Sequence, residues 1–305
     1  MERLLAMRLF ARVVETGTLT KAAAGLRVPA SSATKLLQNL EADLGVQLLE
    51  RTTRRVAVTP AGAAYYDHVR RMLDDLDDVE AQLARGTASP VGTLRVDTGG
   101  SVAAQLLIPA MPAFRERYPD IRLQIGVTDR NVDLTAEGVD CAIRSSADDP
   151  TLIARQIAEL PWTLCASAAY VARRGKPMSA AGLATHDVVG YFSAGTGRAA
   201  PLRLRGADGA VRDHACTSPV EVNESNAHAM SAWAGLGIVQ TLRFQVGEGL
   251  ASGALVELLP DLQPPPLPVY VVYPPNRRNN PRVRAFVEWI ADDLPRRAAG
   301  PANLE

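Results

Sequence analysis

The sequence predicts an α/β protein built from an amino-terminal winged helix-turn-helix, a long helix, and a larger part in which strands and helices alternate. Three observations carry this prediction. Residues 16–59 have the spacing of two short helices, a tight turn and a hairpin, and residues 60–86 repeat apolar side chains every three or four positions. Beyond residue 91, strand and helix patterns alternate, as is typical of an α/β domain. A chain of 305 residues is long enough for two domains.

A first amphipathic helix is expected over residues 2–15, with an apolar face that covers the two helices after it. The next helix is rich in alanine, and it begins after Thr18, whose hydroxyl is suited to accept a hydrogen bond from a free backbone N–H. Pro29 breaks this helix, and Ser31 or Ser32 is expected to begin the following one.

The helix after Pro29 has the pattern of a recognition helix, which lies in the major groove of DNA with its first residues facing the bases. Gly45 is expected to end it. Its apolar side chains recur on one face, at Ala33, Leu36 or Leu37, Leu40 and Leu44. This pattern predicts a DNA-binding protein.

Residues 48–58 predict a short two-stranded wing with a basic tip. Arg51, Arg54 and Arg55 are expected to contact the DNA backbone, although a solvated hairpin has the same pattern. The chain carries no net charge, but its first 60 residues hold nine Lys or Arg against five Asp or Glu. Positive charge is therefore concentrated where contacts to phosphates need it.

Residues 60–86 predict a long helix, because Thr59 is a good N-cap and Pro60 suits the first helical position. Its apolar residues follow a heptad spacing, at Tyr65, Val69, Met72, Leu76, Val79 and Leu83. The stripe is narrow and its flanks are acidic, which favours a coiled coil between two chains over a helix packed on its own domain. A homodimer would place two recognition helices on successive half-sites.

Residues 87–91 are a short hinge, after which strands and helices alternate. A turn at residues 98–101 follows a strand and opens a helix, and a further helix is expected between Asn131 and Gly138. This order predicts a largely parallel sheet with ligands at the carboxyl ends of its strands. Residues 163–265 repeat the pattern, and a cleft between two such parts is the default place for a small ligand.

Several classes of protein are excluded. No window approaches the roughly 20 apolar residues of a membrane span, and the charged residues 2–12 are unlike a signal peptide, so we expect a cytoplasmic protein. The four histidines share no metal-ligand spacing, and the sequence has no HExxH, nucleophile elbow or P-loop, so we expect no enzymatic activity, metal or cofactor. A redox sensor built on Cys216 stays an alternative. A pure solute-binding protein would leave the first 90 residues without a purpose.

The amino-terminal part reads AMRLFARVVETGTLTKAAAGLRVPASSATKLLQNLEADLGVQLLERTTRRVAVTPAG. Further on, the chain carries GTLRVD, LIPAMPAFRERYPDIRL, DLTAEGVDCAIR, LCASAAYVARRG, GLGIVQT and YPPNRRNNPRVRAFVEWIADDL. Together these segments resemble the LysR-type transcriptional regulators over nearly the whole chain.

The resemblance implies a DNA-binding domain over residues 1–59, a dimerising linker helix over 60–86, a hinge over 87–91 and an effector-binding domain over 92–295. It also implies that this last domain has two lobes, as type 2 periplasmic binding proteins do, with lobe one over 92–162 and 267–295 and lobe two over 163–266. The expected partners are a double-stranded DNA operator, a small anionic effector, further copies of the chain as a dimer or a dimer of dimers, and RNA polymerase.

The family's base-facing positions fall on Ala30, Ser31, Thr34 and Lys35 of this sequence. Ala30 departs from the glutamine that is common in the family, and it cannot make the bidentate contact that glutamine makes to adenine. Lys35 keeps a positive charge without the planar fork of arginine. The residues expected to contact DNA are Thr20, Ala30, Ser31, Ser32, Thr34, Lys35, Gln38, Arg51, Thr53, Arg54 and Arg55.

The turn at residues 98–101 presents backbone N–H groups at the start of a helix, which suits a carboxylate or another anion. A tight turn with a serine N-cap has the same pattern, and both can hold at once. The resemblance places the effector here and at later strand ends, although Arg144 could instead pair with Asp140 or Asp148. The expected effector-binding residues are Thr98, Gly99, Gly100, Ser101, Thr128, Arg144, Ser145, Phe192, Ser193, Asn223, Glu224 and Ser225.

Overall fold

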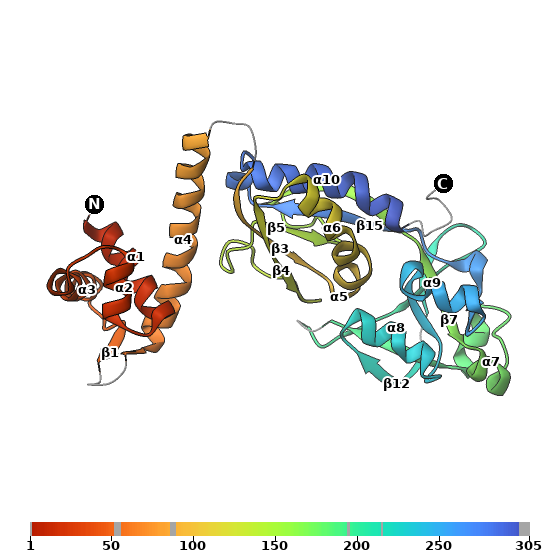
Figure 1. The fold of residues 1–305 in the computed structure, drawn as a ribbon. Coiled ribbons are helices and arrows are strands. Elements are labelled where there is room, and N and C mark those ends of the chain that lie inside the picture. Colours follow the sequence, from red (N-terminus) through yellow and green to blue (C-terminus); the bar gives the residue numbers. More distant parts are fainter. Residues whose placement is uncertain (1, 52–55, 86–89, 194–195, 215, 299–305) are drawn as a thin grey trace. The chain divides into compact units, whose positions relative to one another are not determined.

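The computed structural model describes residues 2–51, 56–85, 90–193, 196–214 and 216–298 (Figure 1). Contacts between residues divide the chain into two compact units, Met1–Gly92 and Thr93–Glu305. Each unit has hydrophobic cores of its own. Among the described residues, no helix combines the length and the apolar character that a membrane crossing requires.

The described residues of the first unit form a helix-turn-helix with a wing and a long helix. Its elements are α1 (Glu2–Thr16), α2 (Leu19–Gly25), α3 (Ala30–Leu44), β1 (Leu49–Arg51), β2 (Val56–Val58) and α4 (Pro60–Arg85). The buried faces of α1, α2 and α3 share one core, in which Leu9, Phe10 and Leu37 are almost wholly buried. Burying each such side chain contributes about 1.5–3 kcal/mol, so this core holds the three helices in place.

Three helix ends in this unit agree with the sequence analysis. Thr18 caps α2, since its hydroxyl accepts the Lys21 N–H at 3.3 Å. Gly45 ends α3 with a φ of 69°, in the left-handed region that glycine adopts without strain. Thr59 accepts a backbone N–H from the first turn of α4 at 2.9 Å, and that helix begins at Pro60.

The expectation that Ser31 or Ser32 begins α3 is wrong. The helix begins at Ala30 with Pro29 as its N-cap, and no side chain caps it. Proline fits there because its ring holds φ at about −65°, and the φ of Pro29 is −58°. Its carbonyl accepts the Ala33 N–H at 2.9 Å. The two serines therefore lie in the first helical turn, where their hydroxyls are left for other contacts.

The described part of the second unit is α/β, as the sequence predicts. Its strands are β3 (Gly92–Thr98), β4 (Ile121–Val127), β5 (Cys141–Arg144), β6 (Ile153–Leu160), β7 (Trp162–Ser167), β8 (Asp187–Phe192), β9 (Ala199–Ala200), β10 (Leu202–Arg205), β11 (Val211–His214), β12 (Thr217–Val222), β13 (Val239–Leu242), β14 (Leu255–Leu258) and β15 (Leu267–Tyr273). Its helical segments are α5 (Gly100–Val102), η1 (Ala103–Leu107), α6 (Ile108–Arg117), α7 (Ala168–Arg174), η2 (Ala181–Thr185), α8 (Ser225–Trp233), α9 (Arg243–Ser252), η3 (Pro260–Leu262), η4 (Pro275–Arg277) and α10 (Pro281–Ala298).

The strands of this unit form two lobes. Lobe one is the five-stranded sheet in the order β4-β3-β5-β15-β6, and Figure 1 shows α10 running along it. Lobe two carries the sheets β13-β7-β14 and β12-β8-β9, the hairpin β10-β11, and helices α7, α8 and α9. The core of lobe one includes an aromatic group in which Phe114 of α6 lies edge-on to Phe286 and Trp289 of α10. The domain boundaries given in the sequence analysis stay predictions.

The sheets are less parallel than the sequence analysis expects. β3 pairs in parallel with β5, and β8 in parallel with β12. β15 is antiparallel to both β5 and β6, and β7 is antiparallel to both β13 and β14. The reason lies in the path of the chain, because β6 leads into lobe two and β15 returns from it, so the two neighbours run in opposite directions.

No helix forms between Asn131 and Gly138, which corrects another expectation. The segment is a series of hydrogen-bonded turns. Asp133 accepts the N–H groups of Thr135 and Ala136 at 3.0 and 2.9 Å, and Gly138 ends the turns with a φ of 66°. A cap and a terminator so close together leave too few residues for a helix, whose first turn is costly to form.

Candidate DNA-binding face and effector cleft

The polar residues of α3 form a row on the face opposite its buried side. Ser31, Lys35 and Gln38 are exposed, and helical spacing places them in one row. Thr34 is half-buried, and its hydroxyl donates to the Ala30 carbonyl at 3.3 Å. Ala30, Ser32 and Thr20 of α2 are exposed as well. The structure therefore brings the predicted base-facing residues together at the start of one helix.

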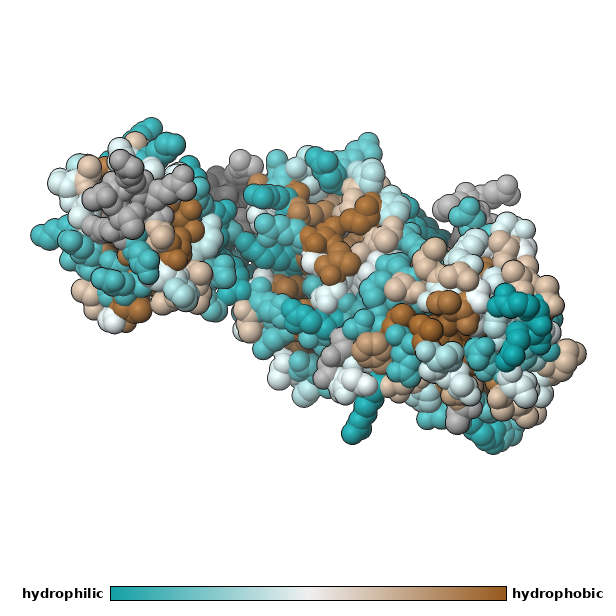
Figure 2. Space-filling model, turned by 90° about the horizontal axis from the view of Figure 1, so that it is seen from below, coloured by the Kyte–Doolittle hydropathy of each residue, from teal (hydrophilic) through white to brown (hydrophobic). Residues whose placement is uncertain are grey.

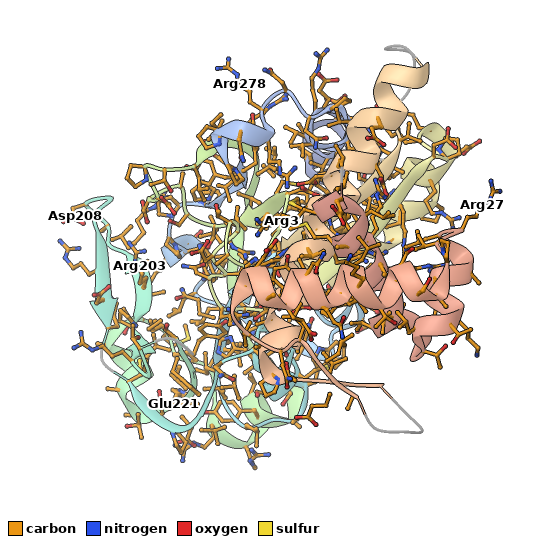
Figure 3. All side chains as sticks on the ribbon, turned by 90° about the vertical axis from the view of Figure 1, so that its left-hand side faces the viewer. Arg3, Arg27, Arg203, Asp208, Glu221 and Arg278 are labelled. Atoms are coloured by element: carbon orange, nitrogen blue, oxygen red, sulfur yellow. The ribbon has the colours of Figure 1, made fainter. Side chains whose placement is uncertain are left out.

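Arg27 is an exposed basic residue that the sequence analysis does not include. It lies in the turn between α2 and α3 with a φ of 55°, a value uncommon for a residue other than glycine. Figure 3 shows its side chain projecting away from the helices. The available signal was an arginine between two predicted helices, in the turn that a helix-turn-helix places close to DNA.

The wing is attached to the recognition helix by Glu41. One oxygen of this carboxylate, Oε1, accepts the Leu48 N–H at 2.8 Å and the Leu49 N–H at 3.1 Å. β1 and β2 then pair antiparallel, with Leu49 opposite Val58. The predicted wing contacts Thr53, Arg54 and Arg55 lie outside the described residues, as does the side chain of Arg51.

The first turn of α4 packs directly on the wing because Gly62 has no side chain. A Cβ at Gly62 would lie 2.0 Å from the Leu48 carbonyl oxygen. Thr59 strengthens this junction, since its hydroxyl donates to the Gln47 carbonyl at 2.8 Å. Wing, recognition helix and long helix are thus fixed to one another.

The first residues of the predicted coiled-coil seam pack within the first unit. Val69 is buried together with Ala11 of α1 and with Leu73. Tyr65 is half-buried, and its ring lies 5.6 Å from that of Phe10. In this half of the helix, α4 therefore packs on its own domain, which is the alternative to a coiled coil that the sequence analysis named.

The second half of the seam has a different environment. Met72 and Val79 are 45% and 52% exposed, and Leu76 is half-buried. The side chain of Leu83 lies outside the described residues. Exposed apolar residues at heptad spacing are the feature that a partner helix covers.

A cavity of about 1150 Å³ lies between lobe one and lobe two. The predicted effector-binding residues that line it are Gly99, Ser101, Thr128, Arg144, Ser145 and Ser225. Thr98, Gly100, Phe192, Ser193, Asn223 and Glu224 are not among its lining residues. Glu224 instead caps α8, where its side chain accepts the N–H groups of Asn226 and Ala227 at 3.0 and 2.8 Å. Much of the wall is apolar, and it includes Trp162, Leu242 and Pro265.

Arg144 lines the cavity but already has a partner within the protein. Its guanidinium is ion-paired with Asp97, and the two side chains are 13% and 6% exposed. Asp140 contacts Arg277 instead, at 3.3 Å, so the pairing with Asp140 or Asp148 left open by the sequence does not form. Burial raises the pKa of Asp97, and the neighbouring guanidinium offsets part of that rise. Arg144 therefore offers little free charge to a ligand.

Asp129 is a cleft residue that the sequence analysis missed. It follows β4 and Thr128, and its Oδ1 accepts the Gly100 N–H at 2.7 Å. Its Oδ2 accepts the Ser225 N–H at 2.6 Å and the Tyr191 hydroxyl at 3.3 Å. Gly100 belongs to lobe one, whereas Ser225 and Tyr191 belong to lobe two. An acidic residue two positions after a strand end was the available signal.

Two groups around this corner have shifted pKa values. Burial raises the pKa of Tyr191 well above its usual range, and the nearby Asp129 raises it further, so the phenol keeps its proton and donates it. Burial lowers the pKa of His228, whose ring lies 5.6 Å from that of Tyr191 and contacts the Val189 carbonyl at 2.9 Å. The imidazole is therefore neutral at physiological pH.

The cysteines have the environment of inert thiols. Cys141 and Cys165 are buried, and burial raises their pKa values, that of Cys165 to about 12. Cys216 lines the cleft and is half-buried, which also raises its pKa. Redox sensing depends on a low pKa, so the geometry does not favour it. Among the described residues, no group of three or more His, Cys, Asp or Glu is placed to hold a metal ion.

Comparisons with known proteins cover both parts of the chain. The family model of bacterial regulatory helix-turn-helix proteins of the lysR family matches residues 4–63, and that of the LysR substrate binding domain matches residues 87–295. The uncharacterized HTH-type transcriptional regulator YhjC of Escherichia coli (strain K12) is 35% identical over 292 residues, which is 95% of this chain and 97% of that protein. An HTH-type transcriptional repressor of Pseudomonas aeruginosa is 35% identical over 295 residues, 96% of this chain and 92% of its own.

A solved full-length structure agrees with these matches. CrgA, a LysR-type transcriptional regulator from Neisseria meningitidis, superposes with a TM-score of 0.61 at 30% identity, covering 95% of this chain and 98% of its own. These relatives are named as regulators of transcription, which confirms the expected class of function. The chain belongs to the LysR family of bacterial transcriptional regulators, which pair a DNA-binding helix-turn-helix with an effector-binding domain.

Proposed function

We propose that this regulator binds its operator as a homodimer, with α3 in the major groove and the wing on the DNA backbone. A small anionic effector in the cleft between the lobes then changes how the paired helices sit on DNA, because it binds two arrangements of the assembly with different affinity. The row formed by Ser31, Lys35 and Gln38 carries this proposal, since it is exposed opposite a buried apolar face. We place the protein in the cytoplasm, where the chromosome lies.

Within this interface, Ser31, Thr34 and Lys35 would read bases, whereas the wing would hold phosphates. Ala30 contributes no hydrogen bond, so specificity at its base pair falls to its neighbours. Arg51, Thr53, Arg54 and Arg55, together with Thr20, Ser32 and Gln38, complete the proposed contact set. Base contacts set sequence preference and phosphate contacts set salt dependence, so the two groups are separable by experiment.

The test measures binding to a promoter fragment and to a scrambled duplex by fluorescence anisotropy at several salt concentrations. Lys35→Ala is expected to reduce the preference for the promoter fragment. The triple change of Arg51, Arg54 and Arg55 to Ala is expected to weaken binding to both duplexes and to reduce the salt slope by about 0.9 for each phosphate that the wing no longer neutralises. Lys176→Ala, an exposed lysine of the second unit, is the control. Wild-type binding by both variants would exclude these contacts.

We further propose that the exposed half of the α4 seam forms a coiled coil with a second copy. Met72 and Val79 lie seven residues apart and are both about half exposed, which suits one side of such an interface. The double change Met72→Lys and Val79→Lys is expected to give monomers by analytical ultracentrifugation, whereas Glu80→Gln on the same helix leaves the dimer intact. A dimer that persists in the double variant would contradict the seam.

A second apolar surface supports assembly beyond a dimer. Met230 and Trp233 of α8 and the nearby Leu236 are 58%, 38% and 45% exposed. Figure 2 shows hydrophobic side chains gathered in several places on the face seen from below. Trp233→Glu is expected to convert a tetramer into dimers in the same experiment.

The cleft is proposed as the effector site because its walls combine a large apolar area with hydroxyls and backbone N–H groups at helix starts. A thermal-shift screen of small organic acids on the full chain tests this. If the regulator activates transcription, RNA polymerase is a further partner, which transcription from the target promoter in vitro would reveal.

A further inference from the structure

One corner of the effector cleft already contains a carboxylate, and that carboxylate belongs to the protein. Asp129 occupies the backbone N–H groups that a ligand carboxylate would need. We propose that Asp129 is an internal ligand, which joins the two lobes and must be displaced before the carboxylate of an effector can bind at this corner. The inference rests on the proposed effector function of the cleft and names the regulation of that site.

The donors around Asp129 come from two helical segments. The Gly100 N–H belongs to the first turn of the continuous segment made of α5, η1 and α6, and the Ser225 N–H belongs to the first residue of α8. The Tyr191 hydroxyl is the third donor, and it keeps its proton. Such charge-assisted hydrogen bonds are about twice as strong as neutral ones, and helix starts favour a negative charge. Asp129 therefore has the contacts of a bound ligand.

The lobes meet at this corner through Asp129 and the residues next to it. Besides the contacts of Asp129 with Ser225 and Tyr191, the Ser101 N–H donates to the Ser225 hydroxyl at 3.1 Å. These bonds join residues that are 62, 96 and 124 positions apart in the sequence and lie in different lobes. The side chain of Asp129 thus joins the two lobes, and moving them apart would break these bonds.

Carboxylates of the protein itself lie against Gly99 and Gly100 at this corner. A Cβ added at Gly99 would lie 3.0 Å from Asp129 Oδ1, and one added at Gly100 would lie 2.5 Å from Glu224 Oε1. Glu224 is itself held by the next two N–H groups of α8. The α8 start is therefore occupied by the protein's own carboxylates, and an external one gains the Gly100 and Ser225 donors only by exchange with Asp129.

The rest of the cavity remains open beside this corner. Trp162 and Leu242 belong to its apolar wall, and Asp129 lines the same cavity. The body of an effector can therefore bind next to Asp129, with its carboxylate competing for the same donors. A ligand without a carboxylate leaves Asp129 in place, so displacement distinguishes anionic effectors from neutral ones.

The test removes the internal carboxylate and supplies an external one to the full-length protein. Asp129→Ala is expected to unfold at a lower temperature than wild type, and acetate is expected to restore the lost stability where acetamide, its uncharged analogue, does not. Acetate affinity, measured by calorimetry, is expected to be at least about tenfold higher in Asp129→Ala than in wild type, where the internal carboxylate competes. Asp149→Ala is the control, because Asp149 accepts only the N–H and hydroxyl of Thr151 in a local turn.

Equal acetate affinities in wild type and Asp129→Ala would overturn the proposal, as would equal rescue by acetate and acetamide. If Asp129→Ala does not fold, Asp129→Ser gives the same comparison, since it also removes the carboxylate and vacates its place while keeping a small polar side chain. Acetate binding is measured without DNA, so its result does not depend on whether the proposed operator binding is correct. Conversely, absence of the acetate effect would contradict the role of Asp129 but not the proposed DNA binding by α3 and the wing.

Discussion

The attachment of the wing to the recognition helix depends on one carboxylate, and this dependence can be measured. Glu41 accepts two N–H groups, those of Leu48 and Leu49, whose residues are 1% and 6% exposed. Hydrogen bonds to a charged acceptor contribute about 1.5–3 kcal/mol each, and a buried donor left alone costs about as much. Glu41 is half-buried and one oxygen serves both donors, so Glu41→Ala is expected to cost about 2–3 kcal/mol in total.

Hydrogen exchange reports this cost directly, because it follows the two amides themselves. Glu41→Ala should speed exchange of the Leu48 and Leu49 amides by roughly 30- to 150-fold, with a parallel loss of operator affinity as the wing loosens. Glu41→Gln keeps an acceptor oxygen in place without the charge, so it should show a smaller increase. Unchanged exchange of both amides in Glu41→Ala would refute the assignment of Glu41 as the anchor of the wing.

Two further predictions concern close packing and a buried ion pair. Gly62→Ala places a Cβ 2.0 Å from the Leu48 carbonyl oxygen, so it should lower both the melting temperature and the DNA affinity. In Gly247→Ala of α9 the new Cβ meets nothing within 4 Å, so this control should raise the free energy of unfolding by up to about 1 kcal/mol. Arg144→Ala should cost about 3 kcal/mol at neutral pH, because it leaves the Asp97 carboxylate buried alone. The pKa of Asp97, already raised by burial, should rise further, and protonation then favours the folded state. Urea denaturation should therefore show the deficit narrowing as the pH falls from about 7 toward 4, and a deficit independent of pH would contradict the pairing.

Local signals accounted for most of the first unit. Thr18, Gly45 and Thr59 act within a few residues of themselves, so their identity alone predicts where helices begin and end. The start of α3 was misplaced because Pro29 and Ser31 are both suited to a helix start, and only the hydrogen bonds of the folded chain decide between them. The apolar spacing of α4 was evident from the sequence. Which of these residues pack on α1 and which are left for a partner helix was not evident, because both kinds of packing use the same spacing.

Several features of the second unit could not be predicted from local sequence patterns. β6 carries exposed side chains over much of its length, so it has no periodicity that predicts a strand. The direction of β15 depends on the path through lobe two, which no local pattern encodes. Asp129 and Ser225 are 96 residues apart, and their contact exists only because the lobes fold against each other. The cleft was therefore predictable as a place, whereas the chemistry of its corner was not.

The position of β15 inside the sheet of lobe one has a consequence for biosynthesis. β6 has β15 as its only neighbour in the order of that sheet, although more than a hundred residues separate the end of β6 from the end of β15. A ribosome must therefore release residue 273 before the outer edge strand acquires any backbone partner, and lobe two has been translated in full by then. We expect nascent chains that stop short of this point to hold an unpaired strand, the kind of edge that chaperones shield and that aggregates capture.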